Sequence, residues 1–143
     1  MKYQQKAENC LDWLCELQKM DMARDLADIT QGELAVLHYL TYTRDGVPAG
    51  TLSAAFGLRS SRVAAILNTL GRKGLARRAA DPADKRRVLV YVTDTGRQAA
   101  GRKRRETIAH TADFLRSLGE EDADALLRIL RRAVARQDAA QPK

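Results

Sequence analysis

Apolar residues recur every three or four positions through most of the chain, a spacing that predicts helices. Residues typical of helix ends divide the pattern: Thr30 and Glu33 are spaced as a capping box, and Ser60 is a suitable N-cap. Gly57 and Gly74 can each end a helix in the left-handed conformation. The predicted helices cover residues 4–23, 30–42, 49–56, 60–73, 93–116 and a last segment that begins at 120.

A β-hairpin is predicted near the middle of the chain. Residues 76–79 and 87–92 read as strands, and the second alternates valines with Leu89 and Tyr91. The turn between them is Asp81-Pro82-Ala83-Asp84. The two helices before the hairpin are joined by a short glycine-containing turn, as in a helix-turn-helix. The predicted fold class is therefore mainly α with a small β-hairpin wing, a winged helix-turn-helix.

Positive charge is concentrated on this winged segment. The chain has 143 residues and a net charge of +7. Residues 59–87 contain nine Lys or Arg and two Asp, a net +7, while the flanks of −3 and +3 cancel. A compact basic element is typical of a protein that binds a polyanion. A second basic run, residues 102–105, is expected to be a solvated helix face that could also approach phosphates.

The predicted helix 60–73 has one apolar and one polar face. Its apolar stripe consists of Val63, Ile66, Leu67 and Leu70. At about 100° per residue, the opposite face carries Ser61, Ala65, Asn68 and Arg72, flanked by Arg62 and Thr69. A helix that enters the DNA major groove needs small residues, donors and no acid on its outer face. An ordinary packed amphipathic helix has the same stripe, and the basic hairpin beside it favours the DNA-binding interpretation.

The segment DPADKRRVLVYVTDTGR, residues 81–97, resembles the wing signature of the MarR family of winged helix-turn-helix transcription regulators. The resemblance extends over roughly residues 26–130. Ala83, Arg87 and Val92 depart from the family pattern, which usually has an arginine, a small residue and a leucine there. The resemblance implies that Arg86 enters the minor groove and that Asp84 orients it. It also implies that the helix after Ser60 is the recognition helix.

The resemblance further implies a homodimer that binds a palindromic operator in double-stranded DNA. Residues 30–93 are expected to form the DNA-binding region, and residues 1–29 and 94–143 the helical dimerisation region. Amphipathic helices at both ends of the chain agree with this, because a two-fold dimer can interlock them. The expected DNA-binding residues are Ser60, Ser61, Arg62, Asn68, Arg72, Asp84, Lys85, Arg86 and Arg87.

A repressor that a small ligand releases is the function that this resemblance favours, and no cofactor or metal is expected. By similarity to the family, the ligand would lie between the dimerisation helices and the winged lobe. The candidate contacts are Trp13, Leu17, His38 and Tyr42. His38 has a simpler interpretation as a structural histidine.

Two alternative functions stay open, and a third, an enzyme, is not expected. A module of the same fold could bind nucleic acid through phosphates alone, without operator specificity. Cys10 or Cys15 could make the protein a redox-sensing repressor, or both could simply pack. An enzyme is not expected, since the chain has no glycine-rich phosphate loop and no Cys/His metal spacing. No apolar run reaches the roughly 18 residues of a membrane span, so a cytoplasmic protein is expected.

Overall fold

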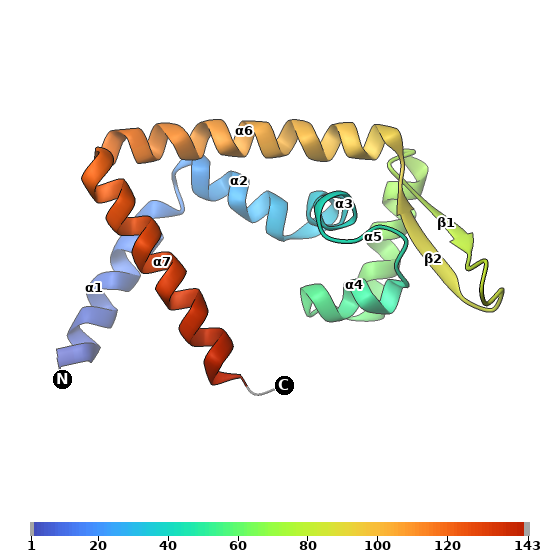
Figure 1. Cartoon of the computed structure of the whole chain (residues 1–143), viewed down its shortest axis with the longest axis horizontal. Helices are drawn as coiled ribbons and strands as arrows, with labels where there is room; N and C mark the ends of the chain where they lie inside the picture. Colours follow the sequence, from blue (N-terminus) through green and yellow to red (C-terminus); the bar gives the residue numbers. More distant parts are fainter. Residues whose placement is uncertain (1, 142–143) are drawn as a thin grey trace. The chain divides into compact units, whose positions relative to one another are not determined.

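The computed structural model describes residues 2–141. It forms two compact units, Met1–Thr107 and Ile108–Lys143, whose boundary falls inside one helix, α6. Among the described residues, no helix is both long and apolar enough to cross a membrane. In chain order the elements are α1 (Lys2–Leu17), α2 (Asp21–Thr30), α3 (Gly32–Tyr42), α4 (Ala49–Phe56), α5 (Ser60–Arg72), β1 (Ala76–Ala80), β2 (Val88–Val92), α6 (Asp94–Leu118) and α7 (Glu120–Ala140) (Figure 1).

Helices α4 and α5 form the predicted helix-turn-helix. Gly57 ends α4 with a φ of 60°, a left-handed conformation, and the peptide N–H of Gly57 donates to the Ser53 carbonyl. The apolar stripe of α5 is fully buried, as its spacing predicts. The core that it completes consists of Val36, Leu37, Leu40, Val47, Leu52, Val63, Ile66, Leu67, Leu70, Ala76, Val90, Val92 and Ala100.

Strands β1 and β2 form the predicted wing, an antiparallel hairpin that projects beyond the neighbouring helices (Figure 1). Val90 and Val92 are buried and hold β2 against the core, and Val90 also pairs with Val47 through two backbone hydrogen bonds. The predicted start of the second strand at Arg87 is wrong by one residue. The amide of Arg87 donates to the carbonyl of Asp84, so Arg87 belongs to the turn. The predicted fold class, a winged helix-turn-helix, is confirmed.

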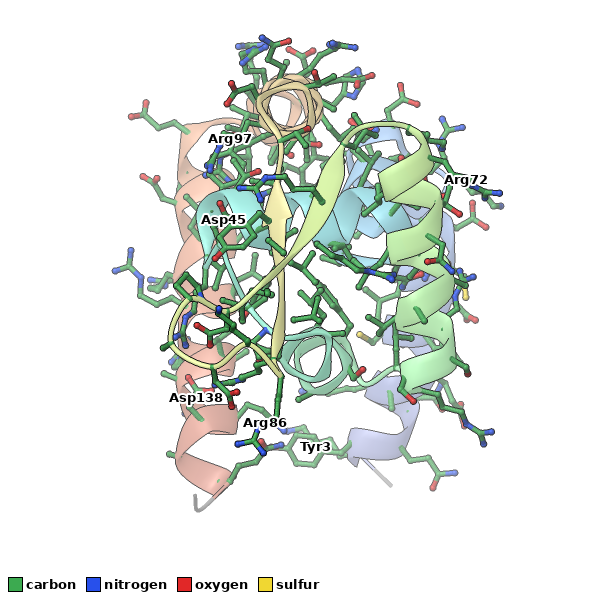
Figure 2. All side chains as sticks on the ribbon, turned by 90° about the vertical axis from the view of Figure 1, so that its right-hand side faces the viewer. Tyr3, Asp45, Arg72, Arg86, Arg97 and Asp138 are labelled. Atoms are coloured by element: carbon green, nitrogen blue, oxygen red, sulfur yellow. The ribbon has the colours of Figure 1, made fainter. Side chains whose placement is uncertain are left out.

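Asp45, in the loop between α3 and α4, attaches the wing to the core. One of its carboxylate oxygens accepts the backbone N–H of Val92 at 2.9 Å, and the other accepts the Arg97 guanidinium at 2.9 Å. Figure 2 shows the Asp45 and Arg97 side chains meeting beside the hairpin. Three separate parts of the chain therefore join at a single carboxylate.

Hydrogen bonds of Thr93 attach the start of α6 to the segment that joins α5 to β1. The hydroxyl of Thr93 donates to the Gly74 carbonyl at 2.7 Å and accepts the Gly96 amide at 3.1 Å, so Thr93 caps α6. The Thr93 amide in turn donates to the Leu75 carbonyl at 3.0 Å. Gly96 lies so close that a Cβ added to it would be 2.0 Å from the Leu75 carbonyl oxygen. This position therefore requires glycine because of its neighbours.

Three predictions about where helices begin and end, and which residues cap them, are wrong. The predicted helix 4–23 is two helices, because the chain leaves helical geometry at Met20 and α2 packs separately against α3. The Thr30 capping box does not form: Thr30 belongs to the last turn of α2, its hydroxyl donates to the Leu26 carbonyl, and Gln31 precedes α3. Ser60 is the first helical residue of α5, and its predicted N-cap role falls to Arg59, whose side chain makes no capping bond.

Candidate nucleic-acid interface

The outer face of α5 is accessible and contains no acidic residue. The five residues expected to contact DNA from this helix, Ser60, Ser61, Arg62, Asn68 and Arg72, are all exposed. The guanidinium of Arg72 lies 3.3 Å from the hydroxyl of Thr69, whose own proton is donated to the Ala65 carbonyl. The face therefore offers small side chains at its amino-terminal end and hydrogen-bond donors further along.

Two aspartates shape the loop at the tip of the wing. The side chain of Asp81 accepts the Ala83 amide at 2.9 Å, and that of Asp84 accepts the Arg86 amide at 3.1 Å. The Nε atom of Arg86 lies 3.6 Å from the same Asp84 oxygen, yet the arginine side chain is 95% exposed. In the view of Figure 2, Arg86 lies at the lower tip of the hairpin, and Arg72 lies near the upper end of α5. Asp84 thus orients the base of a side chain whose end projects into solvent.

An arginine on β1 that was absent from the predicted site contacts the outer face of α5. The Nη2 atom of Arg78 lies 3.0 Å from Oδ1 of Asn68. The preceding Arg77 points to the other face of the hairpin, with its guanidinium carbon 4.6 Å from the centre of the Tyr91 ring. Strand alternation could have revealed the difference, since Ala76 faces the core and Arg78 shares its side of β1.

The four candidate ligand contacts fall on two separate surfaces. Trp13 and Leu17 line a hollow of about 560 Å³ that is formed by α1 and Met20. His38 lines a different hollow, of about 290 Å³, and its ring lies tilted against that of Tyr42, with the ring centres 4.8 Å apart. Arg104 contacts both rings, with Nη1 3.3 Å from His38 Nε2. Partial burial, and secondarily the charge of Arg104, lower the pKa of His38 and so favour its neutral form.

The expectation that residues 102–105 form a solvated face is wrong for one of them. The side chain of Lys103 is 14% exposed, and its Nζ lies 2.8 Å from an oxygen of Asp25 and 3.0 Å from an oxygen of Asp28. These contacts, led by the hydrogen bond to Asp25, raise the pKa of Lys103. The ammonium therefore fastens α6 to α2 and is unavailable to DNA.

A helix-turn-helix followed by a basic hairpin defines the winged-helix class, and comparison with known proteins identifies the family. The MarR family model matches residues 27–87. A Thauera aromatica protein, named as a transcriptional regulatory protein for the hcr operon, is 28% identical over 114 residues, which are 80% of this chain and 68% of that protein. The chain belongs to the MarR family of winged helix-turn-helix transcriptional regulators.

Two solved structures illustrate the similarity. The transcriptional regulator PcaV of Streptomyces coelicolor, in complex with its natural ligand, is 30% identical, with 76% of this chain and 74% of PcaV covered and a TM-score of 0.54. FabT of Streptococcus pneumoniae, in complex with DNA, is 17% identical, with 97% of this chain and 99% of FabT covered and a TM-score of 0.72. At that identity, the likeness to FabT shows a shared fold.

Proposed function

We propose that this chain is a homodimeric repressor that binds a palindromic operator in double-stranded DNA and is released by a small ligand. The observation that carries the proposal is the acid-free, exposed face of α5 beside a basic hairpin whose Arg86 extends into solvent. FabT, which shares the fold, is a protein whose structure contains DNA. Family membership and a basic surface of this shape both support DNA as the partner.

Each part of the surface has its own role in the proposed complex. Helix α5 enters the major groove, where Ser60, Ser61 and Arg62 at its amino end and Asn68 further along meet base edges and phosphates. Arg72 contacts the backbone at the other end of the helix. Arg86, held at its base by Asp84, enters the minor groove, which has strong negative potential in A·T-rich DNA. Lys85 and Arg87 neutralise the flanking phosphates.

A sequence selection tests this function most directly. Fragments bound from random DNA should converge on one palindrome, and the preference for it should persist when the salt concentration is raised. A module that contacts only phosphates would lose affinity for all sequences alike. Convergence on no sequence would contradict the proposal and favour that architectural alternative.

Arg86→Ala is expected to weaken binding to the selected operator by about 1 to 3 kcal/mol, because the minor-groove contact is lost. Fluorescence anisotropy with labelled operator measures the change. Arg24→Ala serves as the control, since it removes an equal charge from an exposed α2 side chain that pairs with Asp21. Equal affinities of the wild type and Arg86→Ala would contradict the assignment of the wing arginine.

Dimerisation is proposed through residues 1–29 and 94–143, because the terminal helices carry large exposed apolar side chains. On α1 these include Leu11, Trp13 and Leu14, of which Trp13 is 74% exposed. On α7 they are Leu127, Ile129, Leu130 and Val134. Exposed apolar surface of this extent marks an interaction site, and a two-fold dimer explains a palindromic operator.

Leu130→Asp is expected to convert a dimer into a monomer, because it places an unpaired charge within the proposed interface. Leu130 is 52% exposed in the single chain, so the folded monomer can accommodate the carboxylate. Sedimentation velocity at micromolar concentration measures the state. Ala135→Asp adds the same charge to an exposed position about 140° around α7 from Leu130 and should remain dimeric. A monomeric wild type would refute the proposed dimer.

Release by a small ligand is proposed over release by oxidation. The PcaV structure contains that protein's natural ligand, and the candidate contacts here are Trp13, Leu17, His38 and Tyr42. Cys10 and Cys15 are both exposed, but five residues of helix separate them by about 7.5 Å of rise, too far for a disulfide within α1. A redox switch would therefore require a bond between subunits or oxidation of a single thiol.

The variant Cys10→Ser, Cys15→Ser is expected to bind operator DNA as tightly as the wild type, and peroxide should release neither protein. The expectation follows from cysteines that serve only as small exposed residues of α1. Gel-shift titrations before and after peroxide treatment provide the measurement. If peroxide released the wild type and left the double variant bound, the redox-sensing repressor would replace the ligand-responsive one.

A further inference from the structure

We infer that Arg78 is a positioning residue that fixes the side-chain amide of Asn68, so that α5 presents a hydrogen-bond donor and reads guanine or thymine in preference to adenine. This inference rests on the proposed function, because it assumes that α5 enters the major groove. It adds a determinant of base preference that lies on the wing strand β1, outside the recognition helix.

The orientation of the Asn68 amide follows from the chemistry of its partner. A guanidinium has five N–H donors and no acceptor, so the group that it contacts must be an oxygen. The 3.0 Å contact therefore joins Nη2 of Arg78 to Oδ1 of Asn68, and the same Nη2 lies 3.5 Å from the carbonyl of Ala64. With Oδ1 engaged, the NH₂ group of Asn68 remains to be offered to DNA.

The fold places Arg78 where this contact can form. On β1, Ala76 is buried against the core, and Arg78 two residues later shares that side of the strand. A hollow of about 250 Å³ between α5 and the hairpin is lined by both Asn68 and Arg78. Arg77 lies on the other side of the strand, where its guanidinium covers the Tyr91 ring. Of these two adjacent arginines, Arg78 bonds to Asn68 and Arg77 packs on Tyr91.

The base preference follows from the groups that bases present in the major groove. An asparagine reads adenine through two bonds, in which its oxygen accepts from N6 and its nitrogen donates to N7. Because Arg78 holds this oxygen toward β1 and occupies one of its two lone pairs, Asn68 forms the first of these bonds less readily. Its NH₂ group can still donate to N7 and O6 of guanine or to O4 of thymine. Wild-type protein should therefore disfavour adenine at the base that faces Asn68.

The experiment measures dissociation constants for a set of operators in which each half-site base is changed in turn. Asn68→Ala identifies the base that Asn68 faces, as the position where discrimination falls by about fivefold or more. At that position, Arg78→Met should raise the affinity for adenine relative to guanine or thymine by about fivefold or more, because the amide oxygen is released. Arg78→Lys retains a donor and should keep the wild-type preference.

Arg77→Met is the matched control, because it removes the same charge from the neighbouring residue without touching Asn68. It should weaken binding to all operators by one common factor. The inference would be overturned if Arg78→Met weakened binding to all operators by one common factor. It would also be overturned if the wild type preferred adenine at the Asn68 position. Circular dichroism of each variant verifies that it is folded.

The same measurements distinguish an error in the role of Asn68 from an error in the proposed function. If one palindrome is preferred but Asn68→Ala changes discrimination at no position, Asn68 reads no base and the inference alone is wrong. If the wild type prefers no sequence, the proposed operator-specific function is wrong, and the inference falls with it. A wild-type preference for guanine or thymine that shifts in Arg78→Met and persists in Arg77→Met supports both.

Discussion

Gly96→Ala is expected to lower the free energy of unfolding by about 3 kcal/mol. The added Cβ would lie 2.0 Å from the Leu75 carbonyl oxygen and 2.7 Å from Cγ2 of Val92. The carbonyl cannot rotate away as a side chain would, because it belongs to the backbone and accepts the Thr93 amide. Relief therefore requires α6 to move away from the segment that joins α5 to β1. Urea titration followed by circular dichroism measures the loss.

Gly50→Ala is the matched control for this experiment. Gly50 lies in α4, and a Cβ added there would have no neighbour within 4 Å. Because alanine has a higher helix propensity, this variant should be slightly more stable than the wild type, by up to about 1 kcal/mol. If Gly96→Ala were as stable as the wild type, the close approach of α6 would be relaxed by small backbone shifts.

Lys103→Met is expected to lower the free energy of unfolding by about 3 kcal/mol, because it leaves the buried carboxylate of Asp25 without the ammonium that balances it. The methionine retains most of the length and apolar volume of the lysine side chain, so packing changes little. The loss of charge pairing is therefore the main effect. The same urea titration at pH 7 measures it.

Lys19→Met is the control, since Lys19 pairs with Glu16 on the exposed surface, and its loss should cost at most about 1 kcal/mol.

The pair at Lys103 also predicts a pH dependence of stability. Because the folded protein raises the pKa of Lys103 above its ordinary value of 10.5, the stabilisation is complete below that pH and is lost at higher pH. The difference between wild type and Lys103→Met should be constant from pH 7 to 9 and narrow above 10.5. If the difference in unfolding free energy were as large above pH 10.5 as at pH 7, charge pairing would be excluded as its cause.

The helix-turn-helix and the wing could be predicted from the sequence because their signals are local. The stripe of α5 repeats at helical spacing, Gly57 stops α4, and β2 alternates between its two faces. The separate helix α2 could not be predicted in the same way. The break at residues 18–20 contains neither glycine nor proline, and α2 is defined by its packing on α3 and by the contact of Asp25 with Lys103.

The predicted site residues lie exposed on α5 and at the tip of the wing, and their contacts with DNA remain predictions. The residues of α5 are exposed on one face, and Arg86 lies near Asp84. The contact between Arg78 and Asn68 was missed because it joins residues ten positions apart in different elements. Spacing along a helix describes one element, and only the packing of β1 beside α5 shows which of the two adjacent arginines reaches the helix.

The wing loop contributes little to the hydrophobic core. Residues 82–87 are all exposed, and the aspartates at 81 and 84 shape the loop by bonds to its own amides. The stability of the hairpin comes from Val90 and Val92, outside the loop. Substitutions at Lys85, Arg86 or Arg87 therefore alter what the wing contacts without unfolding the protein. Duplicated copies of such a gene could acquire new operators through changes in this loop while every intermediate remained folded.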